Sequence, residues 1–506
     1  MKHSYGVLFA LPLLFASDSS ASASTPRDAV RAWRVAHDHQ ILANFSAFLA
    51  MPNVATTLAD VDGNSDYVTH QLENRGFKTE LLRAAPGTPA TVFAERLSPG
   101  AKRTVLFYAH YDGQPVGQKG WLSPPFIPTL RTAPPASAPA DAAGPLDPNA
   151  RLYARGAGDD KASIMAMLAA LDALKAAHIA PTVNIKLLYE GEEEQGSPHL
   201  AAIVRAHRSL LRSDLLIMGD GPMHQSGRQA INGGNRGITS FVATLYGPDK
   251  PLHDGHYGSW APSPAVMAAD LVMQLRDDDG HIKIPGIYDD VTPVSAATRA
   301  ALDALPPVES DLKHALLLGR NLGPARLADG YLAPTLNIRA IHAGDDGPNA
   351  ANAIATEATV SVDFRLAPGE TPTNVKAMTE AYLGTRGWTI VHSAPDAAAR
   401  LAHPKLLRLD WEAGGAVATM TPLDTPAALA VAASIEHTTG TPLIKLPIMG
   451  ASSGFAEVVD ALHAPMVGVS IANYDDNQHA RNENLRLGNL WDGIEVYAGL
   501  LADLDW

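Results

Sequence analysis

Four glutamates fall within five positions of the stretch LYEGEEEQGSPHL, Leu188 to Leu200. The preceding residues, 183–189, are rich in β-branched and apolar side chains and follow Pro181, which predicts a buried strand that ends at the glutamates. Carboxylates crowded at a strand end repel one another unless a cation or a shared proton compensates. A solvated acidic loop is the alternative, and the choice depends on whether other segments supply metal ligands.

Two histidines and several aspartates occupy comparable positions, each just past a strand-like run or in a loop before a helix. They are His110, Asp112, Asp159, Asp160, Asp220 and His479. In a strand, residues two apart point to one side, so Asp112 could accept a hydrogen bond from His110 and fix the tautomer of its imidazole. Asp159 and Asp160, taken alone, are also explained as acids that favour the start of a helix through its macrodipole.

Taken together, two histidines and at least three carboxylates favour a metal site over these separate explanations. Imidazole and carboxylate ligands in combination suit zinc, with manganese or cobalt as substitutes. The crowded glutamates are then tolerable because a dication compensates their charge. The sequence therefore predicts that these side chains meet in one place.

Strand-like and helical runs alternate in the first half of the chain, and these elements must position the candidate side chains. Residues 104–108, 183–189 and 215–218 are short apolar runs, and residues 163–177 carry apolar side chains at helical spacing. This βαβ rhythm predicts an α/β fold with a mostly parallel sheet flanked by helices. The active site of such a sheet lies at the carboxyl ends of its strands, where the candidate residues occur.

The pattern changes near Gly237. Residues 238–247 and 358–366 alternate apolar and polar side chains, as strands of a sheet with one solvated face do, and residues 263–275 and 373–383 are expected helices. The predicted organisation is a signal segment over residues 1–23, a catalytic domain over 24–236 and 419–506, and an inserted α+β lid or dimerisation domain over 237–418.

The composition and the N-terminal sequence limit the classes of binding partner and the cellular compartment that we expect. The 506 residues are 46% hydrophobic and carry a formal net charge of -14, which argues against nucleic acid and anionic membranes as partners. The N-terminus has one early lysine, a short apolar run and the sequence Ala21-Ser22-Ala23, which predicts a cleaved export signal and no membrane anchor. We expect a periplasmic or secreted protein, although the chain contains no cysteine for disulfides.

The ordered motifs resemble a known family, the zinc peptidases with a co-catalytic metal pair that include carnosinase, aminoacylase and the glutamate carboxypeptidases. The matching segments are HYDGQP, RGAGDDK, EGEEEQGS, MGDGP, LHDGHYGS and DDNQHARNENL. The resemblance covers nearly the whole chain after the predicted signal segment. It implies a catalytic α/β domain with an inserted lid and a homodimer formed through that lid.

The resemblance implies two zinc ions per chain, bridged by Asp159. His110 and Asp220 would complete one metal site, and Glu194 and His479 the other. In such enzymes the peptide bond after the bridging aspartate tends to be cis. We therefore expect a cis bond between Asp159 and its neighbour.

The resemblance also assigns roles around the metals. Glu193 would be the general base that activates a water shared by the two ions, and His253, from the lid of a partner subunit in dimeric relatives, would stabilise the oxyanion. Arg365 would bind the free carboxylate of the substrate, a task that suits the guanidinium fork. Asn352 and Ser452 would lie close to the substrate carbonyl and carboxylate.

Three functions remain open at this point. The preferred one is a zinc-dependent exopeptidase that cuts dipeptides or releases a C-terminal amino acid. An N-acyl-amino-acid amidohydrolase is the alternative, because an acyl amide presents the same carbonyl to the metals. A noncatalytic binding or dimerisation module is the third, and it predicts a missing base or ligand, whereas all of these positions are filled.

Overall fold

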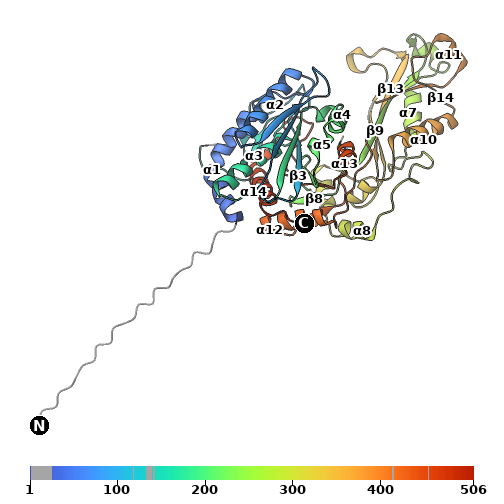
Figure 1. The fold of residues 1–506 in the computed structure, drawn as a ribbon. Coiled ribbons are helices and arrows are strands. Elements are labelled where there is room, and N and C mark those ends of the chain that lie inside the picture. The colour runs from blue at the N-terminus through green and yellow to red at the C-terminus, as the bar shows by residue number, and fades with distance from the viewer. Residues whose placement is uncertain (2–25, 118, 133–138, 141–142, 413–414, 454) are drawn as a thin grey trace.

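The computed structural model describes residues 1, 26–117, 119–132, 139–140, 143–412, 415–453 and 455–506. It has two lobes, each built on its own β-sheet (Figure 1). The predicted signal segment, residues 1–23, lies outside the described residues except for Met1. Within the described ranges, no helix combines the length and apolar character needed to cross a membrane.

The larger lobe contains an eight-stranded sheet. Across the sheet, the strands are β1 (Lys78–Leu82), β2 (Thr91–Arg96), β6 (Asn184–Glu190), β3 (Thr104–His110), β7 (Leu215–Met218), β17 (Met466–Gly468), β8 (Ala230–Asn232) and β16 (Ile444–Leu446). The central strands from β6 to β17 pair in parallel, so the predicted α/β sheet is confirmed. The antiparallel edge formed by β1 and β2 was not expected.

Helices cover both faces of this sheet. One face packs against α1 (Pro26–Leu49), α2 (Leu58–Glu73), α3 (Lys161–Ala176), α12 (Pro426–Thr439) and α14 (Leu487–Asp503). The other packs against α4 (Leu200–Ala206), α5 (Arg208–Leu211) and α13 (Ala456–Leu462). Along β3, Val105 and Phe107 enter the first core, whereas Leu106 and Tyr108 enter the second. Burial on both faces explains why this strand reads as a continuous apolar run.

The parallel strands end at one edge of the sheet, and the candidate ligands follow them there. His110 is the last residue of β3, and Asp220 comes two residues after β7. A separate three-stranded sheet contains β4 (Thr129–Arg131), β5 (Arg151–Tyr153) and β18 (Asn484–Arg486). Its β5–β18 pairing brings the segment before Asp159 beside the segment after His479. Ligands from opposite ends of the sequence are thereby joined.

The smaller lobe contains a five-stranded sheet. In order, its strands are β11 (Thr335–His342), β13 (Glu357–Leu366), β9 (Gly237–Tyr246), β15 (Leu406–Trp411) and β14 (Thr389–Val391). Helices α7 (Pro264–Leu275) and α10 (Pro372–Thr385) pack on one face over a core that includes Phe241 and Phe364. The opposite face carries polar side chains, among them Asn337 and Arg365, and faces a cavity.

One part of the predicted insertion packs with the larger lobe instead. Leu302 at the end of α8 (Ala296–Asp303) and Leu332 at the end of a 3-10 helix (Leu327–Leu332) share a core with Ile444 and Leu446 of β16. Figure 1 accordingly shows α8 at the edge of the larger sheet. The boundaries 237 and 418 enclose all five strands of the smaller sheet, and they stay a prediction as domain limits.

Candidate metal centre

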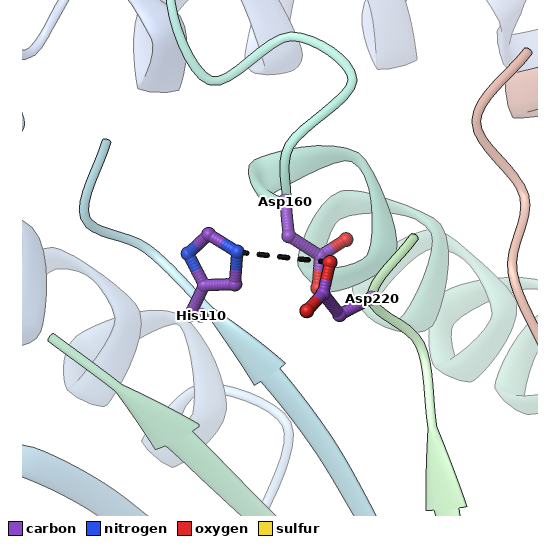
Figure 2. Close-up of side chains that lie close together, drawn as sticks. All are labelled: His110, Asp160 and Asp220. Carbon is purple, nitrogen blue, oxygen red and sulfur yellow. Dashed lines mark ion pairs between the residues drawn. The ribbon is translucent and has the colours of Figure 1, made fainter. Parts of the chain in front are cut away.

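Two groups of ligand side chains lie at the carboxyl edge of the larger sheet. One group is His110, Asp160 and Asp220, which Figure 2 shows converging from β3, the start of α3 and the end of β7. The other is Asp159, Glu194 and His479. Within each group, the ligand atoms lie within 4.8 Å of one another. The structure therefore brings together all five ligands that the sequence predicted.

Asp159 connects the two groups. Its Oδ1 lies 2.8 Å from Nε2 of His110, and its Oδ2 lies 3.2 Å from Nε2 of His479. The same His479 nitrogen lies 3.1 Å from Oε2 of Glu194. The bond from Asp159 to Asp160 is cis, as the resemblance implied. One carboxylate thus faces a histidine of each group, which is the position that a bridging ligand needs.

Asp160 is a site residue that the sequence analysis did not assign. Its side chain is buried, its Oδ1 accepts a hydrogen bond from Ser163, and its Oδ2 has no partner among the described residues. The adjacent acidic pair was the available signal, but a helix-start explanation accounted for it. Its carboxylate belongs to the group with His110 and Asp220.

The structure divides the crowded glutamates into two kinds. Glu190 accepts hydrogen bonds from Tyr108 (2.5 Å) and Ser197 (3.1 Å), and burial raises its pKa to about 8. Glu192 accepts hydrogen bonds from the backbone N–H and the ring of His199. These two glutamates support the turn with their protein partners, whereas the next two face the metal centre.

Glu193 and Glu194 occupy a 3-10 turn (Glu193–Gln195) held by Asp112. The backbone N–H of Glu193 donates to Oδ1 of Asp112 (3.2 Å), and that of Glu194 donates to Oδ2 (3.0 Å). Oδ1 of Asp112 also lies 3.3 Å from Nδ1 of His110. One buried carboxylate therefore positions a predicted ligand on β3 together with the predicted base. Glu193 belongs to neither ligand group.

The electrostatics show an excess of negative charge. Burial, reinforced by the charge of Asp159, raises the pKa of Asp220 to about 7. Burial and then Asp220 raise the pKa of Glu193 well above its usual range. Hydrogen bonds to Asp159 and Glu194 raise the pKa of His479 to about 11. Each shift reflects carboxylates that are held close together away from water.

This charge has few counterions in the protein. Among the described residues, the two histidines are the only cationic partners of these carboxylates, and no lysine or arginine pairs with them. Nitrogen and oxygen donors in two groups of three, with an unpaired buried oxygen on Asp160, fit two dications of the zinc type. The donor set therefore fits the implied metals.

A cavity of about 920 Å³ opens over the metal centre. Glu193 and His479 line it from the larger lobe, and Arg365 lines it from the polar face of the smaller sheet. Nε of Arg365 donates to Oδ1 of Asp363 at 3.2 Å, and its terminal nitrogens have no hydrogen-bond acceptor among the described residues, so they can bind a ligand. Ser452 also lines the cavity, and its hydroxyl donates to a backbone carbonyl at 3.0 Å. The two predicted carboxylate-binding residues thus share one space with the predicted base.

His253 and Asn352 lie elsewhere. His253 ends β10 (Leu252–His253), which pairs with β12 (Ala353–Ile354), and the carbonyl of Asn352 accepts the N–H of Asp254 at 3.1 Å. The side chain of His253 is 60% exposed, and neither residue lines the catalytic cavity of its own chain. Their catalytic roles stay a prediction. The two residues lie close together, since His253 pairs with Ala353, the residue after Asn352.

Comparison with known proteins decides the family. Residues 106–503 match the profile described as Peptidase family M20/M25/M40. The chain belongs to this family. The matched range includes every predicted metal ligand and the predicted base. As a member of the M20 family, this protein is a metallopeptidase and hence a hydrolase. The family resemblance inferred from the motifs is therefore confirmed.

Individual relatives agree with this assignment. A Beta-Ala-His dipeptidase of Homo sapiens is 27% identical over 82% of this chain and 78% of its own. A Cys-Gly metallodipeptidase of Schizosaccharomyces pombe is 26% identical over 58% of this chain and 60% of its own. The crystal structure of an M20 family metallo-carboxypeptidase from Sulfolobus solfataricus matches with a TM-score of 0.76 at 26% identity, covering 92% of this chain and 99% of that one.

A buried glutamate that the sequence analysis missed holds the M20 metal centre together. Glu483, in the segment after His479, has no exposed surface. Its Oε1 accepts the N–H groups of Gly158 and Asp159, both at 3.0 Å. Its Oε2 accepts the N–H of Gly156 at 3.1 Å and Nη1 of Arg155 at 2.7 Å. A single carboxylate therefore fixes the loop that presents the bridging aspartate.

We expect Glu483→Gln to weaken zinc binding by roughly 10- to 100-fold, the usual effect of losing a residue that orients a metal ligand. Glutamine would place an amide N–H₂ against backbone N–H donors, so Asp159 would lose its orientation. Competition with a chromophoric chelator measures the affinity. Glu495→Gln is the matched control, because Glu495 is also buried and pairs with Arg31 (2.6 Å) and Arg34 (3.0 Å) outside the metal centre. Equal zinc affinity in Glu483→Gln and wild type would contradict the orienting role.

Proposed function

We propose that the protein is a zinc-dependent exopeptidase that hydrolyses dipeptides or releases the C-terminal residue of short peptides. The observation that carries the proposal is the shared cavity. Its lining includes two members of one ligand group, Glu194 and His479, together with Glu193, which belongs to neither group, and Arg365 from the smaller sheet. Asp159 joins this ligand group to the other. This arrangement supports hydrolysis of an amide bond close to a free carboxylate.

We assign the site residues separate roles in metal binding and proton transfer. His110, Asp220, Asp159, Glu194 and His479 would hold the ions, which supply Lewis-acid polarisation of the scissile carbonyl and of a water molecule. Glu193 accepts a proton from the attacking water, whose oxygen bonds to the carbonyl carbon. Glu193 then gives that proton to the amine nitrogen as the carbon–nitrogen bond breaks. Asp112 keeps Glu193 in place through the backbone of its turn.

Arg365 supports an exopeptidase because it offers free N–H donors to a carboxylate from the wall facing the base. An N-acyl amino acid would also present a carboxylate, so this residue alone does not separate the two activities. The dipeptidase and carboxypeptidase relatives favour peptide cleavage over deacylation.

Two further properties belong to the same proposal. We infer that the protein is exported, since residues 1–23 have the pattern of a signal sequence. We also infer a homodimer formed through the smaller lobe, since His253 is exposed outside its own catalytic cavity.

Metal content and turnover test the function together. Protein purified without added metal should contain about two zinc ions per chain, the number a co-catalytic pair requires. It should cleave dipeptides, lose activity with a chelator and regain it with zinc. Amidation of the substrate's C-terminus should abolish cleavage because Arg365 loses its carboxylate. Faster cleavage of N-acetyl amino acids than of dipeptides would support the amidohydrolase instead, and absence of both activities after zinc return would overturn the proposal.

A further inference from the structure

A second cavity lies beside the catalytic cavity. Its volume is about 370 Å³, and both cavities are lined by Arg236, Thr335 and Asn337. Because the same residues line both spaces, the second cavity adjoins the catalytic cavity at these three residues. We call this second space the side cavity. Its position suits part of a substrate better than an unrelated ligand.

Leucines make the side cavity apolar. Five come from one segment, Leu312, Leu316, Leu318, Leu322 and Leu327. Leu336 of β11 also borders the cavity, although its side chain is buried in the core of the smaller lobe. Leu318 and Leu322 are 49% and 47% exposed, so they are not committed to a protein core. Apolar side chains gathered around a hollow are typical of a binding site.

The walls of the side cavity come from both lobes. The leucine segment lies between Leu305 and Leu332, which are anchored in the core shared with β8 and β16. On the other side, Arg276 and Leu336 belong to the smaller lobe, and Nη1 of Arg276 donates to the Leu336 carbonyl at 3.1 Å. Arg320 joins the two walls through its ion pairs with Asp278 (2.9 Å) and Asp279 (3.0 Å). Ligand sites are common at such junctions.

The residues shared by the two cavities also contact the proposed carboxylate site. Thr335 lies directly opposite Arg365 in the β11–β13 pairing. Nη2 of Arg236 donates to the Arg365 carbonyl (3.0 Å) and to Oγ1 of Thr335 (3.3 Å). Since neighbouring strands are roughly 4.8 Å apart, the side cavity begins about one strand spacing from Arg365.

A single aspartate fixes the relative positions of these groups. Oδ1 of Asp363 accepts hydrogen bonds from Nε of Arg365 (3.2 Å) and from Nδ2 of Asn337 (3.1 Å). Arg365, which faces the substrate, and Asn337, which faces the side cavity, therefore belong to one hydrogen-bonded unit. A substrate bound by its carboxylate has a defined distance to the leucines.

We propose that the side cavity binds the side chain of the substrate residue that carries the free carboxylate. This inference rests on the proposed function, because it takes Arg365 as the carboxylate-binding residue. That side chain and the carboxylate share one carbon atom, so a long apolar side chain reaches past Thr335 into the leucines. The preferred substrates then end in phenylalanine, leucine or methionine, and a C-terminal glycine leaves the side cavity empty.

Matched dipeptides test the proposal. The measured quantity is the ratio of kcat/KM for Ala-Phe to kcat/KM for Ala-Gly. We expect a wild-type ratio of roughly tenfold or more, since apolar pockets discriminate by such factors for small changes in side chain. Leu318→Asn and Leu322→Asn, each of which puts an amide into the side cavity, should lower the ratio about tenfold.

Leu317→Asn is the matched control. Leu317 lies in the same segment, is 90% exposed and does not line the side cavity. The ratio should therefore stay at its wild-type value in this variant. A general effect of added polarity or of local unfolding would instead appear in all three variants.

The outcomes separate the two proposals. A wild-type ratio near one, or equal losses for both dipeptides in the cavity variants, would overturn the side-cavity proposal. A changed oligomeric state of the cavity variants at an unchanged ratio would assign the leucines to a subunit contact. If wild type cleaves no dipeptide, the proposed function fails, and calorimetric binding of free L-phenylalanine against glycine still tests the cavity. Tighter binding of phenylalanine, reduced by Leu318→Asn, would support it, and equal binding would not.

Discussion

Glu193→Gln should lower kcat by roughly 10³-fold, within the range for removing a general base, while the zinc content stays at its wild-type value. Glutamine keeps the shape and the backbone hydrogen bond to Asp112, but it accepts no proton at neutral pH. Glu193 belongs to neither ligand group, so the metals should remain bound. Steady-state kinetics on a dipeptide, together with metal analysis of the same sample, measure both quantities.

Glu192→Gln is the control for this variant. Glu192 is the preceding residue, is buried, and bonds to the ring and backbone of His199 instead of facing the cavity. Its replacement should change kcat far less than the loss of Glu193 does. Near-normal turnover of Glu193→Gln would remove Glu193 from the role of base, and loss of metal in that variant would make it a ligand.

The sequence predicted the centre of the fold because the motifs that contain His110, the glutamates and Asp220 each follow a recognisable strand. The apolar runs that became β3, β6 and β7 are buried on both faces, and their parallel pairing brings their ends together. The strand pattern alone was therefore enough to place His110 and Asp220 at one edge of the sheet. The interpretation of the glutamates as parts of a metal centre depended on the same geometry.

Contacts between segments that are distant in the sequence could not be predicted from it. Glu483 looks like one more acid in a polar loop, but it bonds to the backbone of Asp159, 324 positions away. Asp160 had a sufficient local explanation at a helix start, and only the structure shows its unpaired oxygen beside the ligands. Packing of α8 against β16 is equally non-local, since apolar periodicity shows which face is buried without showing its partner.

The side cavity could not be predicted from the sequence either, because its lining comes from distant segments. Leu316 and Leu318 belong to no motif, and their exposure is informative only because the cavity that they line is also lined by Thr335, the pairing partner of Arg365. The alternation in β9 and β13 predicted a polar sheet face, and the family resemblance implied a lid that brings Arg365 to the substrate. That face lines the catalytic cavity. Alternation along a strand predicts which side chains lie on each face of the sheet, but it does not predict which part of the protein that face contacts.

His253→Ala should lower kcat by roughly 10²- to 10³-fold, the usual effect of losing one oxyanion donor. The N–H of Gly255 donates to Nδ1 of His253 at 3.1 Å, so the ring proton is assigned to Nε2, which is then a donor. The exposed ring can therefore donate a hydrogen bond from Nε2 to a substrate oxygen, in the site of a partner chain if the proposed dimer forms. His256→Ala is the control, because the two rings lie 4.6 Å apart on the same turn.

Mixing subunits shows where His253 acts. In a dimer of one His253→Ala chain and one Glu193→Gln chain, one catalytic cavity has its own Glu193 and receives His253 from the partner chain. Random assembly of equal amounts should then restore about a quarter of wild-type activity, because half of the two-fold dimers are mixed and each has one intact site. Each variant alone stays inactive at this level. Verified mixed dimers without restored activity would mean that His253 does not complete a site across the interface, and the exposed β10–β12 surface would then need another explanation.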